Sequence, residues 1–181
     1  MIITYHGGGF VKIQHGDLAV AWNPNGLNQI KIGGKAPFVI NGPGEYEVSN
    51  IFIRGFETTG PNETLNTVYV LSLDGLRLAH WGVLGEAKIP EVVSSGIGEV
   101  DVLFVPLDLP AGGASLTPVA AYKLALTFQP KIIVPLSESD TLIRQFLKEA
   151  GAEEVKPIDK FVFKKKDVAE KEGEVIVLSA I

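Results

Sequence analysis

Few nitrogen or sulfur side chains in this sequence could bind a metal ion. His6, His15 and His80 are the only histidines, and the chain contains no cysteine. The three histidines lie far apart, and none of them forms an HxH or HxxxH pair. A zinc or two-metal hydrolase needs several nitrogen, sulfur or oxygen ligands that converge on one point. This content therefore argues against a zinc site.

Oxygen ligands offer a different site. The predicted carboxyl ends of several strands carry His80, Glu86, Asp108, Ser137 and Glu138, and such ends line the sites of layered α/β folds. One histidine with several carboxylates could hold Mg²⁺ or Mn²⁺, which favour oxygen ligands. The alternative interpretation is that these are ordinary polar loop residues.

The sequence HGGG at residues 6–9 matches the oxyanion loop of lipases, in which backbone amides stabilise a tetrahedral intermediate. That chemistry also requires a GxSxG nucleophile turn, and the chain contains none. We therefore predict a tight turn, in which the glycines allow close backbone approach.

Composition and charge exclude several classes of protein. The net charge is −5 and the basic residues are scattered apart from residues 164–166, so nothing indicates nucleic-acid binding. This lysine run is predicted to be the solvated end of a hairpin. No run approaches the ~20 apolar residues of a membrane span, and the opening MIITYHGGGF lacks the basic and apolar regions of a signal peptide, so we expect neither kind of segment. These features, with the absence of cysteine, predict a cytoplasmic protein without a membrane or nucleic-acid partner.

The elements that must position these residues change in type along the chain. Short strands separated by turn residues are predicted at 2–5, 10–14, 18–22, 38–40, 45–48, 51–56, 67–73 and 76–80. From residue 101 the pattern alternates, with strands at 102–105 and 132–135 and helices at 117–128 and 139–150. A short helix at 90–95 and strands at 160–164 and 174–178 complete the prediction. The result is one domain, residues 1–181, with the α/β architecture of a layered sandwich: two mixed β-sheets with outer helices.

Five segments spread over most of the chain carry a family resemblance. They read ITYHGGGFVKIQ, LAVAWNPNG, FVINGPGEYEVSNIFIRGF, NTVYVLSLDGLRLAHWGVLGE and IIVPLSES. In this order they resemble the metallo-β-lactamase fold superfamily, in particular its small bacterial hydrolases related to the ascorbate-lactone hydrolases. The resemblance implies an αββα sandwich and a metal-dependent hydrolase.

The differences from the family pattern fall on its metal ligands. The family's HxHxDH loop would lie within residues 25–36, which are too short a segment and contain no histidine or aspartate. Val83 stands where the family has a bridging aspartate, Ser137 where it has its last histidine, and Thr59 near the place of a further histidine. Valine has no lone pair and serine is a poor neutral ligand for zinc, so the resemblance predicts no family metal site.

Three positions near the family's metal site also deserve comparison: two carry a different residue, and one carries a histidine that is not usually a ligand. Asn23 replaces the aspartate of Asp-Pro, and Gly8 replaces the histidine of Gly-His-Ser. His80 matches a family histidine that neighbours the site and is not usually a ligand. We expect Trp81, next to His80, to fill the space of metal and substrate, since a large apolar ring needs no ligand.

Three hypotheses follow. The first is a pseudoenzyme without catalytic residues, metal or cofactor that binds or assembles with a protein partner or a second copy. The second is a hydrolase of phosphodiesters, lactones or esters, in which His80, Asp108 and Glu138 hold Mn²⁺ or Mg²⁺. The third makes the former active-site face a subunit interface.

Overall fold

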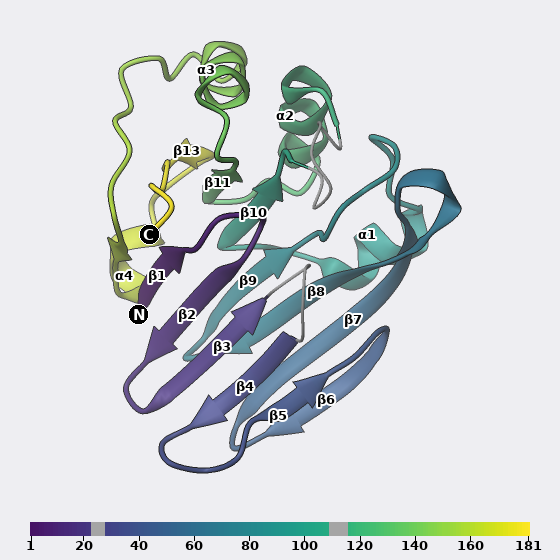
Figure 1. The fold of residues 1–181 in the computed structure, drawn as a ribbon, viewed down its shortest axis with the longest axis vertical. Helices are drawn as coiled ribbons and strands as arrows, with labels where there is room; N and C mark the ends of the chain where they lie inside the picture. The colour runs from purple at the N-terminus through teal and green to yellow at the C-terminus, as the bar shows by residue number, and fades with distance from the viewer. Residues whose placement is uncertain (23–27, 109–115) are drawn as a thin grey trace.

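Two β-sheets packed face to face form the centre of the molecule (Figure 1). The computed structural model describes residues 1–22, 28–108 and 116–181. The first sheet has six strands in the order β12-β1-β2-β3-β4-β5, and all its pairs are antiparallel. Its strands are β1 (Ile2–Tyr5), β2 (Val11–His15), β3 (Leu18–Trp22), β4 (Asn28–Ile32), β5 (Phe38–Ile40) and β12 (Phe161–Val162).

The second sheet has seven strands in the order β13-β11-β10-β9-β8-β7-β6, and it is mixed. The neighbours β6, β7, β8 and β9 pair antiparallel in this sequence. The neighbours β9, β10, β11 and β13 pair parallel. The strands are β6 (Gly44–Val48), β7 (Ile51–Thr59), β8 (Leu65–Leu73), β9 (Leu76–His80), β10 (Val102–Pro106), β11 (Ile132–Leu136) and β13 (Glu174–Val175). A 3₁₀ turn, η1 (Pro61–Glu63), connects β7 to β8.

The helices lie on the outer face of the seven-stranded sheet and at one end of the sandwich. They are α1 (Glu91–Ile97), α2 (Pro118–Leu126), α3 (Asp140–Glu149) and α4 (Lys165–Val168). The side chains of Thr117 and Ser139 accept hydrogen bonds from the first turns of α2 and α3, which fixes where these two helices begin. No described helix is long and apolar enough to cross a membrane.

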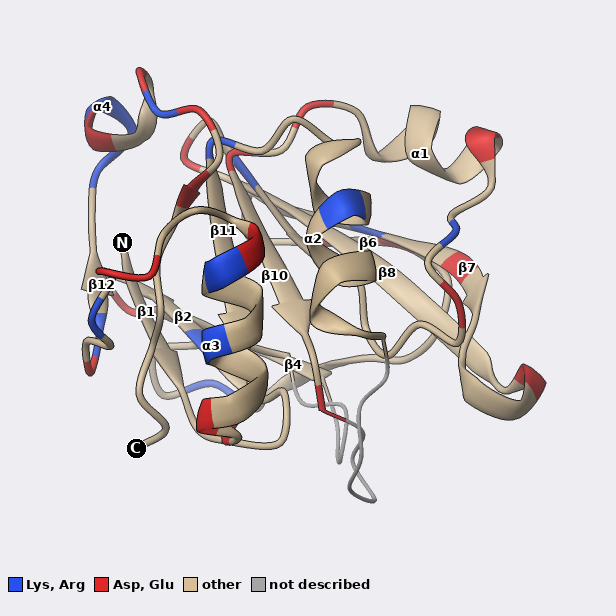
Figure 2. Cartoon of the chain, turned by 90° about the horizontal axis from the view of Figure 1, so that it is seen from above, with Lys and Arg blue, Asp and Glu red and all other residues tan. Residues whose placement is uncertain are grey.

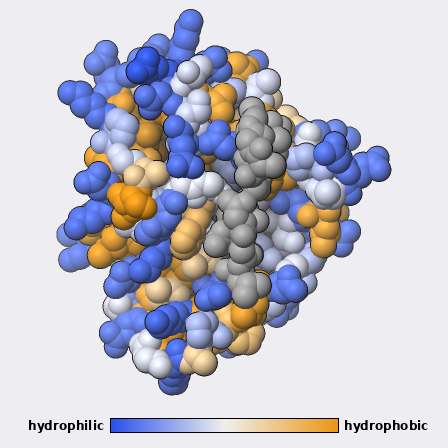
Figure 3. All heavy atoms as spheres, in the orientation of Figure 1, coloured by the Kyte–Doolittle hydropathy of each residue, from blue (hydrophilic) through white to orange (hydrophobic). Residues whose placement is uncertain are grey.

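Alternation of side chains along the strands produces two separate apolar cores. Ile3, Tyr5 and Trp22 belong to the core between the sheets. Their neighbours on the other face of the six-stranded sheet are more exposed, and Figure 3 shows hydrophilic and hydrophobic residues interspersed there. Strands β10 and β11 are buried on both faces, because α2 and α3 cover the side that the first sheet does not.

The predicted α/β sandwich is confirmed, and the structure refines it. The six-stranded sheet is antiparallel throughout, and no helix in the described ranges covers its outer face. The prediction of a loop at residues 25–36 is wrong for Asn28–Ile32, which pairs with β3 and buries Ile30 in the core. The lysine run is not a hairpin end. It enters α4, because Val168 is completely buried and Asp167 accepts a hydrogen bond from the Lys164 amide.

Candidate functional site

Residues from four segments meet at the edge where β1, β9, β10 and β11 end. The Nε2 atom of His80 lies 3.2 Å from the Gly9 carbonyl oxygen in the turn between β1 and β2. The amide of Gly8 donates to Oε2 of Glu138 at 3.1 Å, and the amide of Glu138 donates to Oδ2 of Asp108 at 2.9 Å. The structure therefore brings together the predicted residues Gly8, Asp108 and Glu138, and His80 contacts the neighbouring Gly9.

His80 is buried, and both of its ring nitrogens are engaged. The Gly82 amide, which can only donate, lies 3.0 Å from Nδ1, so Nδ1 is the acceptor and Nε2 carries the proton given to Gly9. Burial lowers the pKa of the imidazole to about 4, although the hydrogen bond to Gly9 acts in the opposite direction. His80 is thus a neutral imidazole at pH 7 with no lone pair free for a metal.

Aromatic rings enclose this imidazole. The ring centroid of Trp22 lies 5.7 Å from that of His80 and 5.7 Å from that of Phe104, and the rings of His80 and Phe104 are 6.2 Å apart. The expectation that Trp81 fills this space is wrong. Successive strand residues point to opposite faces, so Trp81 packs in the core under the helices.

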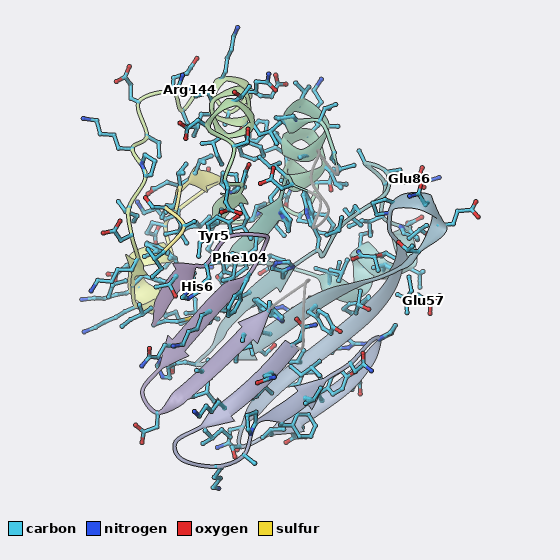
Figure 4. All side chains as sticks on the ribbon, viewed as in Figure 1. Tyr5, His6, Glu57, Glu86, Phe104 and Arg144 are labelled. Atoms are coloured by element: carbon cyan, nitrogen blue, oxygen red, sulfur yellow. The ribbon has the colours of Figure 1, made fainter. Side chains whose placement is uncertain are left out.

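Tyr5 lies at the same edge, at the end of β1, and Figure 4 shows it near Phe104. Burial raises the pKa of its phenol to about 12, and the negative charges of Asp108 and Glu138 act in the same direction. The Gly9 backbone opposes the rise. Within the described residues, neither the Tyr5 hydroxyl nor Nε1 of Trp22 has a hydrogen bond of regular geometry.

Glu138 connects β11 to the glycine turn. A Cβ atom on Gly7 would lie 2.9 Å from Cδ of Glu138, and Gly7 has a φ of +79°. Only glycine meets both conditions without strain, so the carboxylate and the turn require one another. The predicted tight turn at residues 6–9 is thereby explained: it accommodates the Glu138 carboxylate and exposes an amide to it.

The loop that holds Val83 is fixed by a different residue. Oδ1 of Asn66 accepts a hydrogen bond from the Val83 amide at 2.9 Å, and its Nδ2 donates to the Trp81 carbonyl at 2.8 Å. The Gly85 amide donates to the Thr59 carbonyl at 3.1 Å, which brings the loop beside the end of β7. Thr59 and Val83 therefore lie in the same part of the structure, and the Asn66 side chain holds the Val83 loop there.

The remaining predicted positions are placed as follows. Ser137 is buried, and its hydroxyl accepts a hydrogen bond from the Ser139 amide at 2.9 Å, ahead of α3. Glu86 lies far from Tyr5 (Figure 4), so the prediction that it lines this edge is wrong. Asn23 lies outside the described residues.

The sequence profile of the family described as "Beta-lactamase superfamily domain" matches residues 14–137, more than half of the chain. The chain belongs to the β-lactamase superfamily. Among curated proteins, none matches this sequence.

Two solved structures share the superfamily fold with this chain. One, from Thermotoga maritima, is described as a proposed Zn-dependent hydrolase of the metallo-β-lactamase superfamily; it is 24% identical, with a TM-score of 0.74 and 98% of each chain covered. The other is a metallo hydrolase from Ignicoccus hospitalis, 14% identical, with a TM-score of 0.58, covering 90% of this chain and 99% of its own. At these identities the similarity extends to the fold alone.

The zinc that the superfamily implies does not fit the residues of this chain. Across residues 1–22, 28–108 and 116–181, no three His, Asp or Glu side chains are grouped so that they could hold a metal ion. Residues 23–27 and 109–115 contain none of these residue types. Of the two histidines at this edge, His80 already uses both nitrogens. Nε2 of His6, in the glycine turn, lies 3.0 Å from the Thr4 hydroxyl, and its ring stacks on Phe10.

Proposed function

We propose that this chain is a pseudoenzyme of the β-lactamase superfamily, which binds or assembles with a partner and does not hydrolyse a substrate. The observation that carries the proposal is the state of His80. Its imidazole is buried among aromatic rings, and each nitrogen has a hydrogen-bond partner. A metal could bind there only after the Gly9 or Gly82 contact had broken and the aromatic core had opened.

The substituted ligand positions support the same proposal. Val83 offers no lone pair, and Ser137 directs its hydroxyl oxygen to the start of α3. These positions have structural partners of their own, which a metal would have to displace. Loss of the metal then removes both the Lewis acid and the activated water of superfamily hydrolysis.

The direct test is metal analysis of protein purified with zinc and manganese supplied. We expect far less than one equivalent of either metal per chain, and equal amounts in wild type and Glu138→Gln. Stoichiometric metal that is lost in His80→Asn or Glu138→Gln would contradict the proposal. Lys148→Gln, on the exposed side of α3, is the matched control for a substitution that cannot affect the edge.

A second candidate rests on the contact between Asp108 and Glu138. These carboxylates lie on adjacent loops, and both act on the buried Tyr5 phenol. Because both nitrogens of His80 are engaged, a hydrolase rebuilt at this edge would hold Mn²⁺ or Mg²⁺ through Asp108 and Glu138 alone, with phosphodiesters, lactones or esters as substrates. Turnover in the presence of Mn²⁺ that disappears in Glu138→Ala would favour this candidate. Equal background rates in wild type and Glu138→Ala would count against it.

The proposed binding role also requires a partner, either another cytoplasmic protein or a second copy of this chain. Light scattering at micromolar concentration separates these two possibilities. A dimer or larger assembly supports the second copy, and a monomer leaves the other protein as the partner.

A further inference from the structure

A second site lies at the opposite end of the strands from His80. A cleft of about 810 Å³ opens where β9, β10 and β11 begin, between the end of α1, the end of α2 and the segment around α4. Four cationic residues line it: Arg77, Lys131, Lys165 and Lys171. We propose that this cleft binds a small molecule that carries a phosphate group on a hydroxyl-rich body, such as a phosphorylated sugar.

Arg77 supplies a fixed guanidinium whose charge is not neutralised by an ion pair in the described structure. Its Nε donates to the Glu99 carbonyl at 2.9 Å, and one terminal nitrogen donates to the Ile97 carbonyl at the end of α1. Because these carbonyl oxygens are uncharged, they hold the guanidinium in place without neutralising its positive charge. A guanidinium has five N–H donors, so the remaining ones can meet a phosphate.

Lys165, the first residue of α4, contributes a second cation over the same strand start. Its Nζ lies 2.8 Å from where a Cβ atom on Gly75 would be. Because Gly75 has no side chain and occupies a turn with a φ of +68°, the ammonium reaches directly over the beginning of β9. Among the described residues, Lys165 has no ion pair or hydrogen-bond partner through its side chain.

The other charges of the cleft are mostly balanced. Asp101 accepts from Nζ of Lys131 at 2.6 Å and from the Arg77 amide at 2.8 Å, and Lys171 pairs with Glu174. Two further carboxylates in the lining, Glu99 and Glu172, are exposed, as Lys165 is, so water and salt screen all three, and none of them forms an ion pair in the described structure. Lys165 and Arg77 are therefore the cations available to an anionic ligand, in a chain whose net charge is −5.

The remaining lining indicates the body of the ligand. Ser95 and Gln129 offer a hydroxyl and an amide group, which suit a polyhydroxylated molecule. The hydroxyls of Ser94 and Thr127 already donate to the carbonyls of Glu91 and Leu124, so they can only accept from a ligand. Phe128 also borders the cleft but is only 7% exposed, so it provides little of an aromatic surface on which a nucleobase could stack. The volume lies within the range of about 300–1,000 Å³ that is usual for small-molecule sites.

The cleft is independent of the edge that holds His80. Arg77 lies near the beginning of β9, and His80 ends it. Figure 2 shows α1 and α4 at the end of the molecule where β10 begins, away from the end where that strand stops. The inference stands whether or not the chain retains hydrolytic activity.

The test is isothermal titration calorimetry of the whole chain with four probes: glucose 6-phosphate, inorganic phosphate, adenosine 5′-monophosphate and glucose. We expect glucose 6-phosphate to bind more tightly than phosphate or the nucleotide, and glucose to give no signal. Lys165→Glu should weaken the binding of glucose 6-phosphate by at least about tenfold, which is the effect of losing one charge-assisted contact. Lys165→Gln should weaken this binding by less. Lys148→Glu makes the same charge change on α3 and should leave the affinity unchanged.

Three outcomes would overturn the inference. The first is no binding of either phosphate or glucose 6-phosphate at millimolar concentration. The second is equal weakening by Lys165→Glu and Lys148→Glu, which would assign binding to net charge alone. The third is binding of adenosine 5′-monophosphate as tight as that of glucose 6-phosphate, which would contradict the claim that the cleft selects a sugar-like ligand. Circular dichroism of each variant verifies that the fold is intact.

Discussion

The two ends of strand β9 differ in how their polar groups are used. At the carboxyl end, His80 is buried, neutral and hydrogen-bonded through both nitrogens. Near the amino end, Arg77 keeps its charge and borders an open cleft with Lys165. The carboxyl end is where the superfamily resemblance places chemistry, yet both nitrogens of its buried histidine are taken up by contacts within the fold. The amino end, to which the resemblance assigns no role, has the features of a ligand site.

The largest expected effect comes from opening the aromatic core at the His80 end. Trp22→Ala removes a buried ring that contacts both His80 and Phe104, and it should lower the free energy of unfolding by about 3–5 kcal/mol. Urea denaturation measures this change. Phe38→Ala, at a ring that is 43% exposed, is the control and should have a clearly smaller effect. Equal losses in the two variants would mean that Trp22 does not seal this end.

The pH dependence of stability should report the buried imidazole. The folded pKa of His80, about 4, lies below the usual 6.5, so the unfolded chain binds more protons between these values. Stability is then complete above pH 6.5 and falls as the pH decreases toward 4, by about 2–4 kcal/mol in total. Denaturation at several pH values should show this slope in wild type and in His15→Gln. His80→Asn should be less stable and lack this part of the slope.

A moderate effect is expected where Glu138 meets the glycine turn. Gly7→Ala places a Cβ against the carboxylate and imposes a left-handed backbone on alanine, which should cost about 1–3 kcal/mol. In the double variant with Glu138→Ala the steric part of the loss should disappear, while the backbone part remains. Strict additivity of the two substitutions, measured by thermal denaturation, would show that the carboxylate does not occupy the turn.

The smallest effect is expected at the amino end of β9. Lys165 is exposed and unpaired within the described structure, so Lys165→Glu should change the free energy of unfolding by no more than about 0.5 kcal/mol. A loss above about 2 kcal/mol would make this lysine a structural residue and remove the contrast between the two ends.

Much of the fold could be predicted because local signals and tertiary structure agree. The strands predicted at 67–73 and 76–80, with the turn between them, and the helix start at Thr117 all correspond to the structure. Strand β4 was missed because its polar residues lie between turn-forming segments, and pairing with β3 and β5 orders it. The short helix α4 depends on Val168, which is buried by parts of the chain far away in sequence.

The site was harder to predict because its contacts are long-range. The bond between His80 and Gly9 spans 71 residues, and that between Gly8 and Glu138 spans 130. Asn66, Tyr5 and Trp22 carry no motif that marks them. One signal was present: in a strand, neighbours point to opposite faces, so Trp81 could not share the surroundings of His80, whereas the strand-ending Trp22 could.

The most direct test of the account is long-range ¹H–¹⁵N NMR of the His80 ring. We predict a neutral Nε2–H tautomer, no titration above about pH 5, and unchanged ring nitrogen shifts when zinc is added. A pKa near 6.5, or a shift of either ring nitrogen on addition of stoichiometric zinc, would contradict the claim that this histidine is sealed within the fold.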